Sequence, residues 1–193
     1  CPMNTRWPES RVREALAGIG AVLLGEALER GGSAQARGGA EGLDDGRWAT
    51  VVFTSGSSGR PKAAVHSLAN HRASAAASNC NIELGVGDRW LLSLPLYHVG
   101  GLGVLFRCLA AGATVVVSEE LLPEGITHVS LVSTQLYRML QDDVAKKKLA
   151  LMKAVLMGGS GMPESLIGEA CAAGIPIHRS YGMTEMSTQI TST

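Results

Sequence analysis

The sequence has no excess of charge of either sign. Among its 193 residues, 17 Lys and Arg balance 17 Asp and Glu, so the formal net charge is zero. Basic residues nowhere form a stripe interleaved with aromatic side chains, the pattern expected of a nucleic-acid surface. No overall field therefore attracts nucleic acid or an anionic membrane, and electrostatic recognition has to be local.

Long apolar runs and paired cysteines are also missing. No run approaches the roughly 20 residues that a membrane helix needs, and the first residues lack the charged-then-apolar pattern of a signal peptide. The four cysteines, at positions 1, 80, 108 and 171, include no Cys-x-x-Cys pair. Their spacing indicates neither a zinc site nor a disulfide framework. These absences predict a cytoplasmic protein with reduced thiols and no membrane partner.

The sequence does have enough apolar residues, 46% of the total, for one sizeable core. From residue 48 onward, short apolar runs alternate with segments of helical periodicity. That alternation predicts an α/β fold in which a mostly parallel sheet is flanked by helices on both faces. Residues 1–47 are predicted to be an opening segment and a flexible connector, and residues 48–193 the α/β core.

The most informative stretch is a loop of hydroxyls, glycines and a cation after the apolar run 48–53, which is predicted to be a buried strand. Gly56 and Gly59 let peptide N–H groups approach an anion closely. The side chains around them suit phosphate binding: Thr54, Ser55, Ser57, Ser58 and Lys62. The spacing differs from a Walker A loop. Residues 63–81 are predicted to form a helix whose N-terminus would add positive charge beside the anion.

Three blocks in a fixed order resemble the adenylate-forming superfamily, which includes acyl- and aryl-CoA synthetases. They are residues 53–62, residues 95–101 and residues 180–185. A weaker match is 158–160, which borders the adenine pocket in that superfamily. The resemblance implies part of the large N-terminal domain of such an enzyme. It also implies ATP, Mg²⁺ and coenzyme A as cofactors and cosubstrates, and a small-molecule carboxylic acid as the other substrate.

The same resemblance implies a role for each matched side chain. His98 would line the acid pocket and orient the substrate, and Glu185 would bind Mg²⁺. Lys62 and Thr184 would contact phosphates, with His98 and Glu185 completing the catalytic set. Tyr181 would stack on adenine. The remaining nucleotide-binding residues would be Gly158, Gly159, Ser160, Ser180, Gly182 and Met183.

Within the superfamily, residues 62–66, 91–98, 127–136 and 180–185 look most like the o-succinylbenzoate:CoA ligases of menaquinone biosynthesis. An aromatic dicarboxylate needs a second cation or donor set for the carboxylate that does not react. The candidates are Arg107, Ser133, Thr134 and Gln135. Two alternatives stay open: another acyl- or aryl-CoA synthetase, and a non-catalytic nucleotide-binding fragment.

The chain ends before the ribose-binding aspartate and the small lysine-bearing C-terminal domain of that superfamily, and it begins late. We therefore expect a fragment with weak or absent ligase activity by itself. The sequence leaves open whether the chain forms a homo-oligomer.

Overall fold

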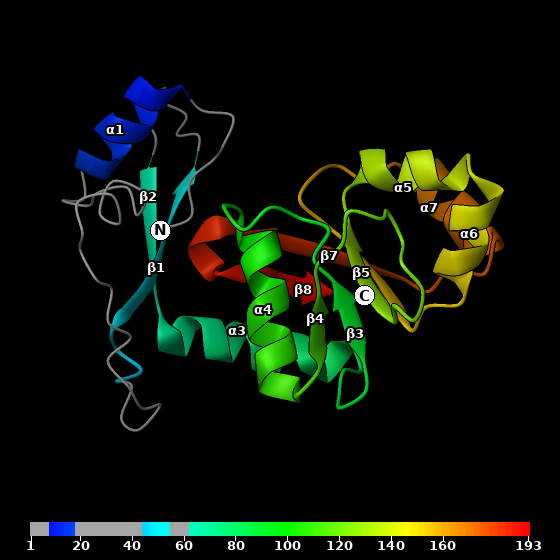
Figure 1. The fold of residues 1–193 in the computed structure, drawn as a ribbon, viewed down its shortest axis with the longest axis horizontal. Coiled ribbons are helices and arrows are strands. Elements are labelled where there is room, and N and C mark those ends of the chain that lie inside the picture. The colour runs from blue at the N-terminus through cyan, green and yellow to red at the C-terminus, as the bar shows by residue number, and fades with distance from the viewer. Residues whose placement is uncertain (1–7, 18–43, 55–61) are drawn as a thin grey trace.

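The strands of the chain form two separate sheets. A computed structural model describes residues 8–17, 44–54 and 62–193. The strands are β1 (Trp48–Thr54), β2 (Lys62–Ser67), β3 (Arg89–Leu91), β4 (Thr114–Val116), β5 (His128–Leu131), β6 (Ala154–Met157), β7 (Ile177–Met183) and β8 (Thr188–Ser192). The main sheet has six strands in the order β4-β3-β5-β6-β7-β8, and β1 and β2 form a hairpin beside it (Figure 1).

Helices cover both faces of the main sheet. The helices in the described residues are α1 (Glu9–Ala17), α3 (Leu68–Asn81), α4 (Val99–Ala111), α5 (Ser133–Leu140), α6 (Asp143–Ala150), α7 (Glu164–Ala172) and the short 3-10 helix η1 (Thr184–Met186). Helices α3 and α4 lie on one side, and α5, α6 and α7 on the other (Figure 1). Within the main sheet every strand pair from β4 to β7 is parallel, and β8 pairs antiparallel with β7. The predicted α/β fold with a mostly parallel sheet is confirmed.

The central strands are buried on both sides, and successive residues face different helices. Val129 and Leu131 of β5 pack into one apolar cluster with Met157 of β6 and with helices α5, α6 and α7. Trp90 of β3 and Leu156 of β6 belong to a second cluster on the side of α4. Because both faces are covered, these strands appear in the sequence as nearly continuous apolar runs.

The segment after residue 61 corrects the sequence prediction. Residues 62–67 form β2, paired antiparallel with β1 so that Thr54 lies opposite Lys62. Helix α3 begins only at Leu68, where Ser67 and Asn70 form a capping box. The predicted helix is therefore wrong from 63 to 67. The prediction of a buried strand at 48–53 is also wrong in part, since Val52 is the single fully buried residue of β1.

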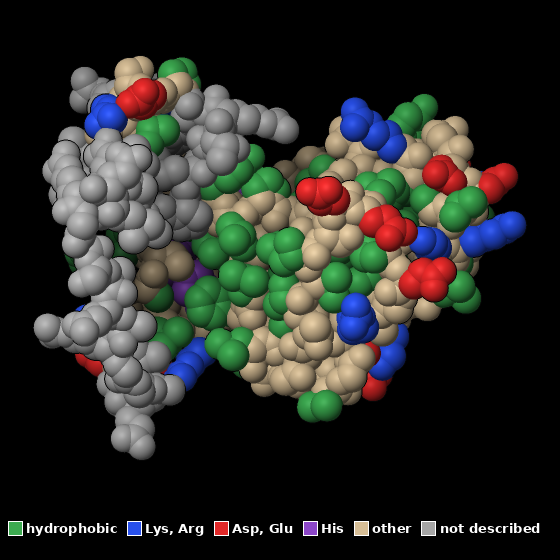
Figure 2. All heavy atoms as spheres, viewed as in Figure 1, with side chains coloured by type: hydrophobic (Ala, Val, Ile, Leu, Met, Phe, Trp, Pro, Cys, Tyr) green, Lys and Arg blue, Asp and Glu red, His purple; other side chains and the backbone are tan. Residues whose placement is uncertain are grey.

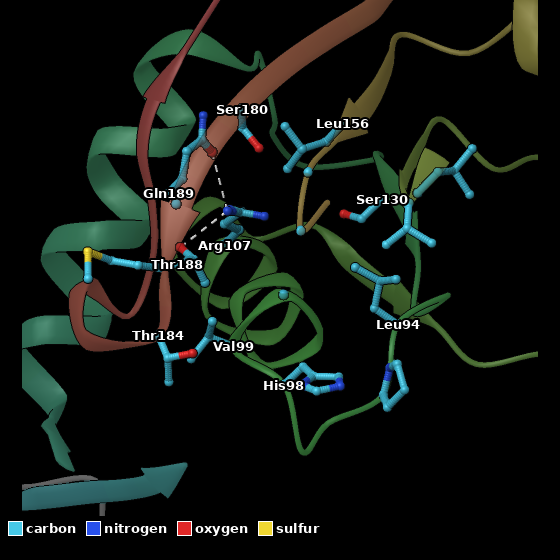
Figure 3. A pocket seen from close by; sticks show the side chains of 18 residues that line it. Leu94, His98, Val99, Arg107, Ser130, Leu156, Ser180, Thr184, Thr188 and Gln189 are labelled. Atoms are coloured by element: carbon cyan, nitrogen blue, oxygen red, sulfur yellow. Dashed lines mark hydrogen bonds between the residues drawn. The ribbon is translucent and has the colours of Figure 1, made fainter. Parts of the chain in front are cut away.

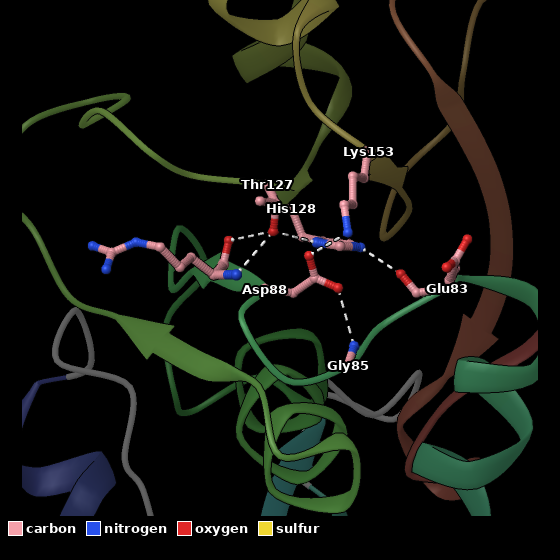
Figure 4. Close-up of polar contacts among 7 residues, drawn as sticks. Glu83, Gly85, Asp88, Thr127, His128 and Lys153 are labelled. Atoms are coloured by element: carbon pink, nitrogen blue, oxygen red, sulfur yellow. Dashed lines mark hydrogen bonds and ion pairs between the residues drawn. The ribbon is translucent and has the colours of Figure 1, made fainter.

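A polar cluster ties together the amino ends of the parallel strands (Figure 4). Buried Asp88, just before β3, lies 2.8 Å from Nζ of Lys153, just before β6, and accepts the N–H of Gly85 at 3.0 Å. Burial raises the pKa of Asp88, but the hydrogen bonds from Lys153 and Gly85 outweigh it and leave the pKa below its ordinary value. His128, which begins β5, donates from Nε2 to the carbonyl of Glu83 at 2.8 Å. The carboxylate therefore stabilises the folded chain at neutral pH.

Charged side chains of both signs lie interspersed over the part of the surface formed by α5, α6 and α7 (Figure 2). This mixture fits the zero net charge of the sequence. Of the helices in residues 8–17, 44–54 and 62–193, none has the length and apolar character that crossing a membrane requires.

Asp88→Ala is expected to lower the free energy of unfolding by about 2 kcal/mol, because it removes a buried carboxylate that pairs with Lys153 and accepts the N–H of Gly85. Asp45→Ala is the matched control, since Asp45 also contacts a cation, Arg72, at 2.6 Å but is half exposed. That variant should lose less than about 1 kcal/mol. Urea denaturation measures both changes, and equal losses would contradict a stabilising role for the Asp88 cluster.

Candidate functional site

A cavity of about 370 Å³ opens at the carboxyl ends of the parallel strands. Its walls come from the segments that end or follow β3, β5, β6 and β7, together with α4, η1 and β8 (Figure 3). Carboxyl ends of parallel strands meet at one edge, and the connections beyond them leave a crevice there. The cavity thus lies where this fold class binds its ligands.

Eight residues from the sequence-predicted set line this cavity, although they come from four separate stretches of the chain. They are His98, Arg107, Gly158, Gly159, Ser180, Gly182, Met183 and Thr184. Two of the predicted acid-side residues, His98 and Arg107, therefore share one space with part of the nucleotide-side set.

Other predicted residues do not line the cavity. Tyr181 is 65% exposed, and Glu185 is exposed on η1. The candidate acid-binding residues at the start of α5 make hydrogen bonds to nearby backbone groups. Gln135 accepts the N–H of Val132 at 3.0 Å, and Ser133 donates to the carbonyl of Gly161 at 2.6 Å. Thr134 is exposed and Ser160 donates to Ser133. Because these groups serve the helix start and the adjacent turn, they are not directed into the cavity.

The centre of the predicted phosphate loop, namely Ser55, Gly56, Ser57, Ser58 and Gly59, lies outside the described residues. Its two flanks are described. Thr54 ends β1, Lys62 begins β2, and the two face each other across the hairpin. Strand β2 in turn contacts η1. The hairpin that carries the loop therefore lies against the turn that holds Thr184 and Glu185.

His98 lies at the N-cap of α4, where the chain leaves β3 and enters the helix. Its imidazole lines the cavity and packs against the ring of Tyr97, with the ring centroids 4.7 Å apart. Although the side chain remains accessible to solvent, desolvation by surrounding protein atoms lowers the pKa of His98 below its ordinary value. A neutral imidazole at neutral pH can accept or donate a hydrogen bond to a bound acid.

Gly101 explains how the chain can turn so tightly into α4. A Cβ at this position would lie 2.3 Å from the carbonyl oxygen of Pro95 and 2.6 Å from that of Leu94. Only a residue without a side chain lets the first turn of α4 approach the preceding segment this closely. The glycine therefore sets the position of His98.

Arg107, two and a half turns along α4 from His98, is a buried cation in the cavity wall, only 3% exposed. Its Nη2 donates to Oγ1 of Thr188 at 3.4 Å and Oε1 of Gln189 at 3.3 Å, and its guanidinium lies 5.4 Å from the ring centre of Trp90 (Figure 3). Its Nε has no hydrogen-bond partner among the residues that the structure describes. Burial lowers the pKa of Arg107 to about 10, so the side chain is still charged at neutral pH.

No carboxylate in the described part of the chain lies within ion-pair distance of Arg107. A buried charge without a counterion is costly in free energy, and long hydrogen bonds to neutral groups offset little of that cost. The site is therefore suited to a ligand that brings a negative charge.

Sequence reasoning missed Thr188 and Gln189, which line the cavity from β8 and contact Arg107. Ser74 and Ser78 of α3 support them, through hydrogen bonds of 2.8 Å and 2.9 Å respectively. The sequence signal was slight, because a five-residue strand directly after the third block has no distinctive pattern. Its antiparallel return along β7 is what brings these residues to the cavity.

The described residues contain no cluster of three or more His, Cys, Asp or Glu side chains that could hold a metal ion. A dedicated metal cage is therefore not part of this region. A single carboxylate such as Glu185 fits Mg²⁺ bound mainly by phosphate oxygens and water.

The fold and the cavity define an enzyme domain of the adenylate-forming type. The sequence profile of the AMP-binding enzyme family matches residues 8–193, nearly the whole chain. The chain belongs to this family.

Relatives within the family agree with one another. The chain is 43% identical over 148 residues to 2-succinylbenzoate–CoA ligases of Salmonella typhimurium and Escherichia coli, a match covering 75% of this chain and 32% of each relative. Wild-type E. coli MenE, solved with an analogue of OSB-AMS, has a TM-score of 0.82 and 34% identity over 99% of this chain and 45% of that one. The Bacillus subtilis o-succinylbenzoate coenzyme A synthetase, solved with ATP and magnesium ion, has a TM-score of 0.80 and 26% identity, covering 99% and 46%.

The chain thus spans about a third of the length of the curated relatives it matches. It corresponds to part of the large domain of such an enzyme, as the sequence predicted.

Gly101→Ala is expected to lower the free energy of unfolding by about 1–3 kcal/mol, because the added methyl group has no room against the backbone. Gly168→Ala is the control within a helix, since a Cβ there meets nothing within 4 Å. That change should be neutral or stabilising by up to about 1 kcal/mol. Thermal denaturation compares the two, and a tolerated Gly101→Ala would contradict the close approach.

Proposed function

We propose that the protein carrying this chain activates a carboxylic acid with ATP and transfers the acyl group to coenzyme A. We further propose that the acid is o-succinylbenzoate, which would give the protein a role in menaquinone biosynthesis. The agreement among the relatives supports the reaction. The buried cation in the cavity, Arg107, supports the choice of o-succinylbenzoate as the acid. A cytoplasmic location belongs to the same proposal, because both cosubstrates are cytoplasmic metabolites.

The reaction has two steps. An oxygen of the carboxylate attacks the α-phosphorus of ATP, the bond to pyrophosphate breaks, and an acyl-AMP forms. The sulfur of coenzyme A then attacks the acyl carbon, losing its proton, and AMP leaves as the thioester forms. A free carboxylate is a poor acyl donor, since its leaving group would be an oxide, whereas AMP is a good leaving group.

The residues of this chain would act mainly by binding and by electrostatic stabilisation. Lys62 and the hydroxyl of Thr184 would neutralise charge that builds up on the phosphates during attack. His98 would orient the attacking carboxylate. Gly158, Gly159 and Ser180 would border the nucleotide. Mg²⁺, bound through Glu185 when present, would supply further neutralisation of phosphate charge.

The choice of acid rests on Arg107, which is buried in the cavity wall without a carboxylate partner among the described residues. It lines the same cavity as His98, from a position two and a half turns further along α4. Because both side chains line this cavity, an acid whose reacting carboxylate lies near His98 could present a second carboxylate to the guanidinium of Arg107. The ring carboxylate of o-succinylbenzoate would supply the negative charge that Arg107 lacks, and the free Nε would complete a bidentate pair.

Arg107→Ala should therefore abolish the preference for a dicarboxylate. We expect the wild-type protein to bind o-succinylbenzoate about 100-fold more tightly than benzoylpropionate, which lacks the ring carboxylate, equivalent to about 2.7 kcal/mol. In Arg107→Ala the two acids should bind alike, and Arg107→Lys should keep part of the difference, since it retains charge but not the planar fork. Calorimetric titration measures each dissociation constant.

Arg138→Ala is the matched control, because Arg138 is an exposed arginine on α5 away from the cavity. It should leave both dissociation constants unchanged. Equal binding of the two acids by the wild-type protein would indicate another acyl- or aryl-CoA synthetase. Absence of ATP binding, or ATP binding unaffected by Lys62→Ala, would favour a non-catalytic domain.

A further inference from the structure

Two buried histidines beside the cavity join the β1-β2 hairpin to the turn that carries Thr184. Nε2 of His66 lies 2.6 Å from the carbonyl oxygen of Thr184, and its Nδ1 lies 3.3 Å from Oγ1 of Thr50. The same hydroxyl lies 2.8 Å from Nε2 of His71, whose Nδ1 lies 2.6 Å from Oγ of Ser187. Four hydrogen bonds thus run without a break from Thr184 to Ser187.

The series begins and ends on one turn. The N–H of Ser187 donates to the carbonyl of Thr184 at 3.0 Å, which closes the hydrogen bonds into a ring. Ser187 is the C-cap of η1 and has a φ of 64°, in the left-handed region. The ring therefore holds both ends of the turn that presents Glu185, and we call it the histidine ring.

With both histidines neutral, the carbonyl of Thr184 fixes the direction of every proton in the histidine ring. A carbonyl oxygen only accepts, so Nε2 of His66 carries a proton and its Nδ1 accepts from the hydroxyl of Thr50. That hydroxyl must accept from Nε2 of His71, whose Nδ1 then accepts from Ser187. One arrangement with two neutral histidines satisfies all four bonds.

The surroundings of the histidine ring favour a neutral His71. Both imidazoles are 1% exposed, and the ring of His71 stacks on Phe106 of α4 with centroids 4.0 Å apart. Burial first, and the neighbouring His66 second, lower the pKa of His71 to about 4. Because each member is buried or partly buried, loss of one partner leaves other polar groups unpaired.

The histidine ring joins three segments with different contributions to the site. Thr50 and His66 belong to the hairpin whose far end carries Lys62 and the predicted phosphate loop. His71 lies on α3, and the turn of η1 presents Thr184 to the cavity. The hairpin is not part of the main sheet, so sheet hydrogen bonds do not fix its position relative to that turn.

We propose that His66 and His71 are positioning residues that lock the turn carrying Thr184 and Glu185 onto the hairpin, so that the phosphate-binding groups of the two segments keep one spacing. This inference rests on the proposed function. It assigns the histidines no contact with substrate, because they act through the carbonyl of Thr184 and the hydroxyl of Ser187.

Two substitutions at His66 distinguish the effect of the hydrogen bond to Thr184 from the effect of simply having a polar side chain at this position. The amide nitrogen of Gln can occupy the place of Nε2 and still donate to Thr184, whereas the amide of Asn is too short to reach it. We expect His66→Asn to weaken binding of ATP with magnesium by about tenfold or more, and His66→Gln by less than about threefold. Calorimetric titration with MgATP measures both.

His128 offers a matched control at the opposite edge of the sheet. It is also fully buried, and its two ring nitrogens contact the carbonyl of Glu83 and the hydroxyl of Thr127. His128→Asn should lower the unfolding free energy as much as His66→Asn does, yet leave MgATP affinity unchanged. Equal effects of the two Asn variants on affinity would reduce the histidine ring to a general stabilising element and overturn the proposal.

Hydrogen exchange tests the lock without any ligand. Exchange of the Ser187 amide should be faster in His66→Asn but not in His128→Asn, and unchanged exchange in His66→Asn would refute the lock. If His66→Asn does not fold, Thr50→Val removes the central hydroxyl with little change in volume and should produce the same faster exchange and weaker binding. Failure of the wild-type protein to bind MgATP would instead refute the proposed function, while the exchange result would still decide whether the histidine ring holds the turn.

Discussion

Strands β4, β3, β5, β6 and β7 run in the same direction, and this parallel alignment determines where everything else in the chain lies. Their carboxyl ends meet at one edge, so the segments that leave them converge there. The amino ends meet at the opposite edge, where Asp88 and Lys153 hold the beginnings of β3 and β6 together. Ligand-facing groups and stabilising groups are therefore separated by the length of the strands.

At the carboxyl edge, the chain buries polar groups whose partners come from distant segments. Arg107 depends on Thr188 and Gln189 of β8, and these depend on Ser74 and Ser78 of α3. The histidine ring connects the same helix to the hairpin and to η1. Buried polar networks of this kind favour one arrangement strongly, since any displacement leaves several groups unsatisfied at once. The cavity is shaped by these networks as much as by the apolar core.

The central strands and the helices α4, α5 and α7 could be predicted from their apolar patterns, whereas the lysine-rich α6 was not predicted as a helix. The error at 63–67 has a clear cause, since alanine-rich segments favour helix, but pairing with β1 overrides that preference. Gln135 could not be placed from sequence, because its amide binds the backbone of its own helix start. Tyr181 and Glu185 fall in a predicted block, yet the alternation of β7 and the tight turn of η1 leave both exposed.

The sequence by itself determined the fold class, the family and eight of the eighteen residues that line the cavity, because these follow from local periodicity and from blocks of adjacent residues. Only the tertiary structure decided that Arg107 lacks a carboxylate partner among the described residues, and that His66 and His71 share one hydroxyl. Both facts depend on contacts between residues far apart in the chain. Their geometry is set by how hairpin, helices and sheet pack together, and a linear pattern does not encode which distant donor meets which acceptor.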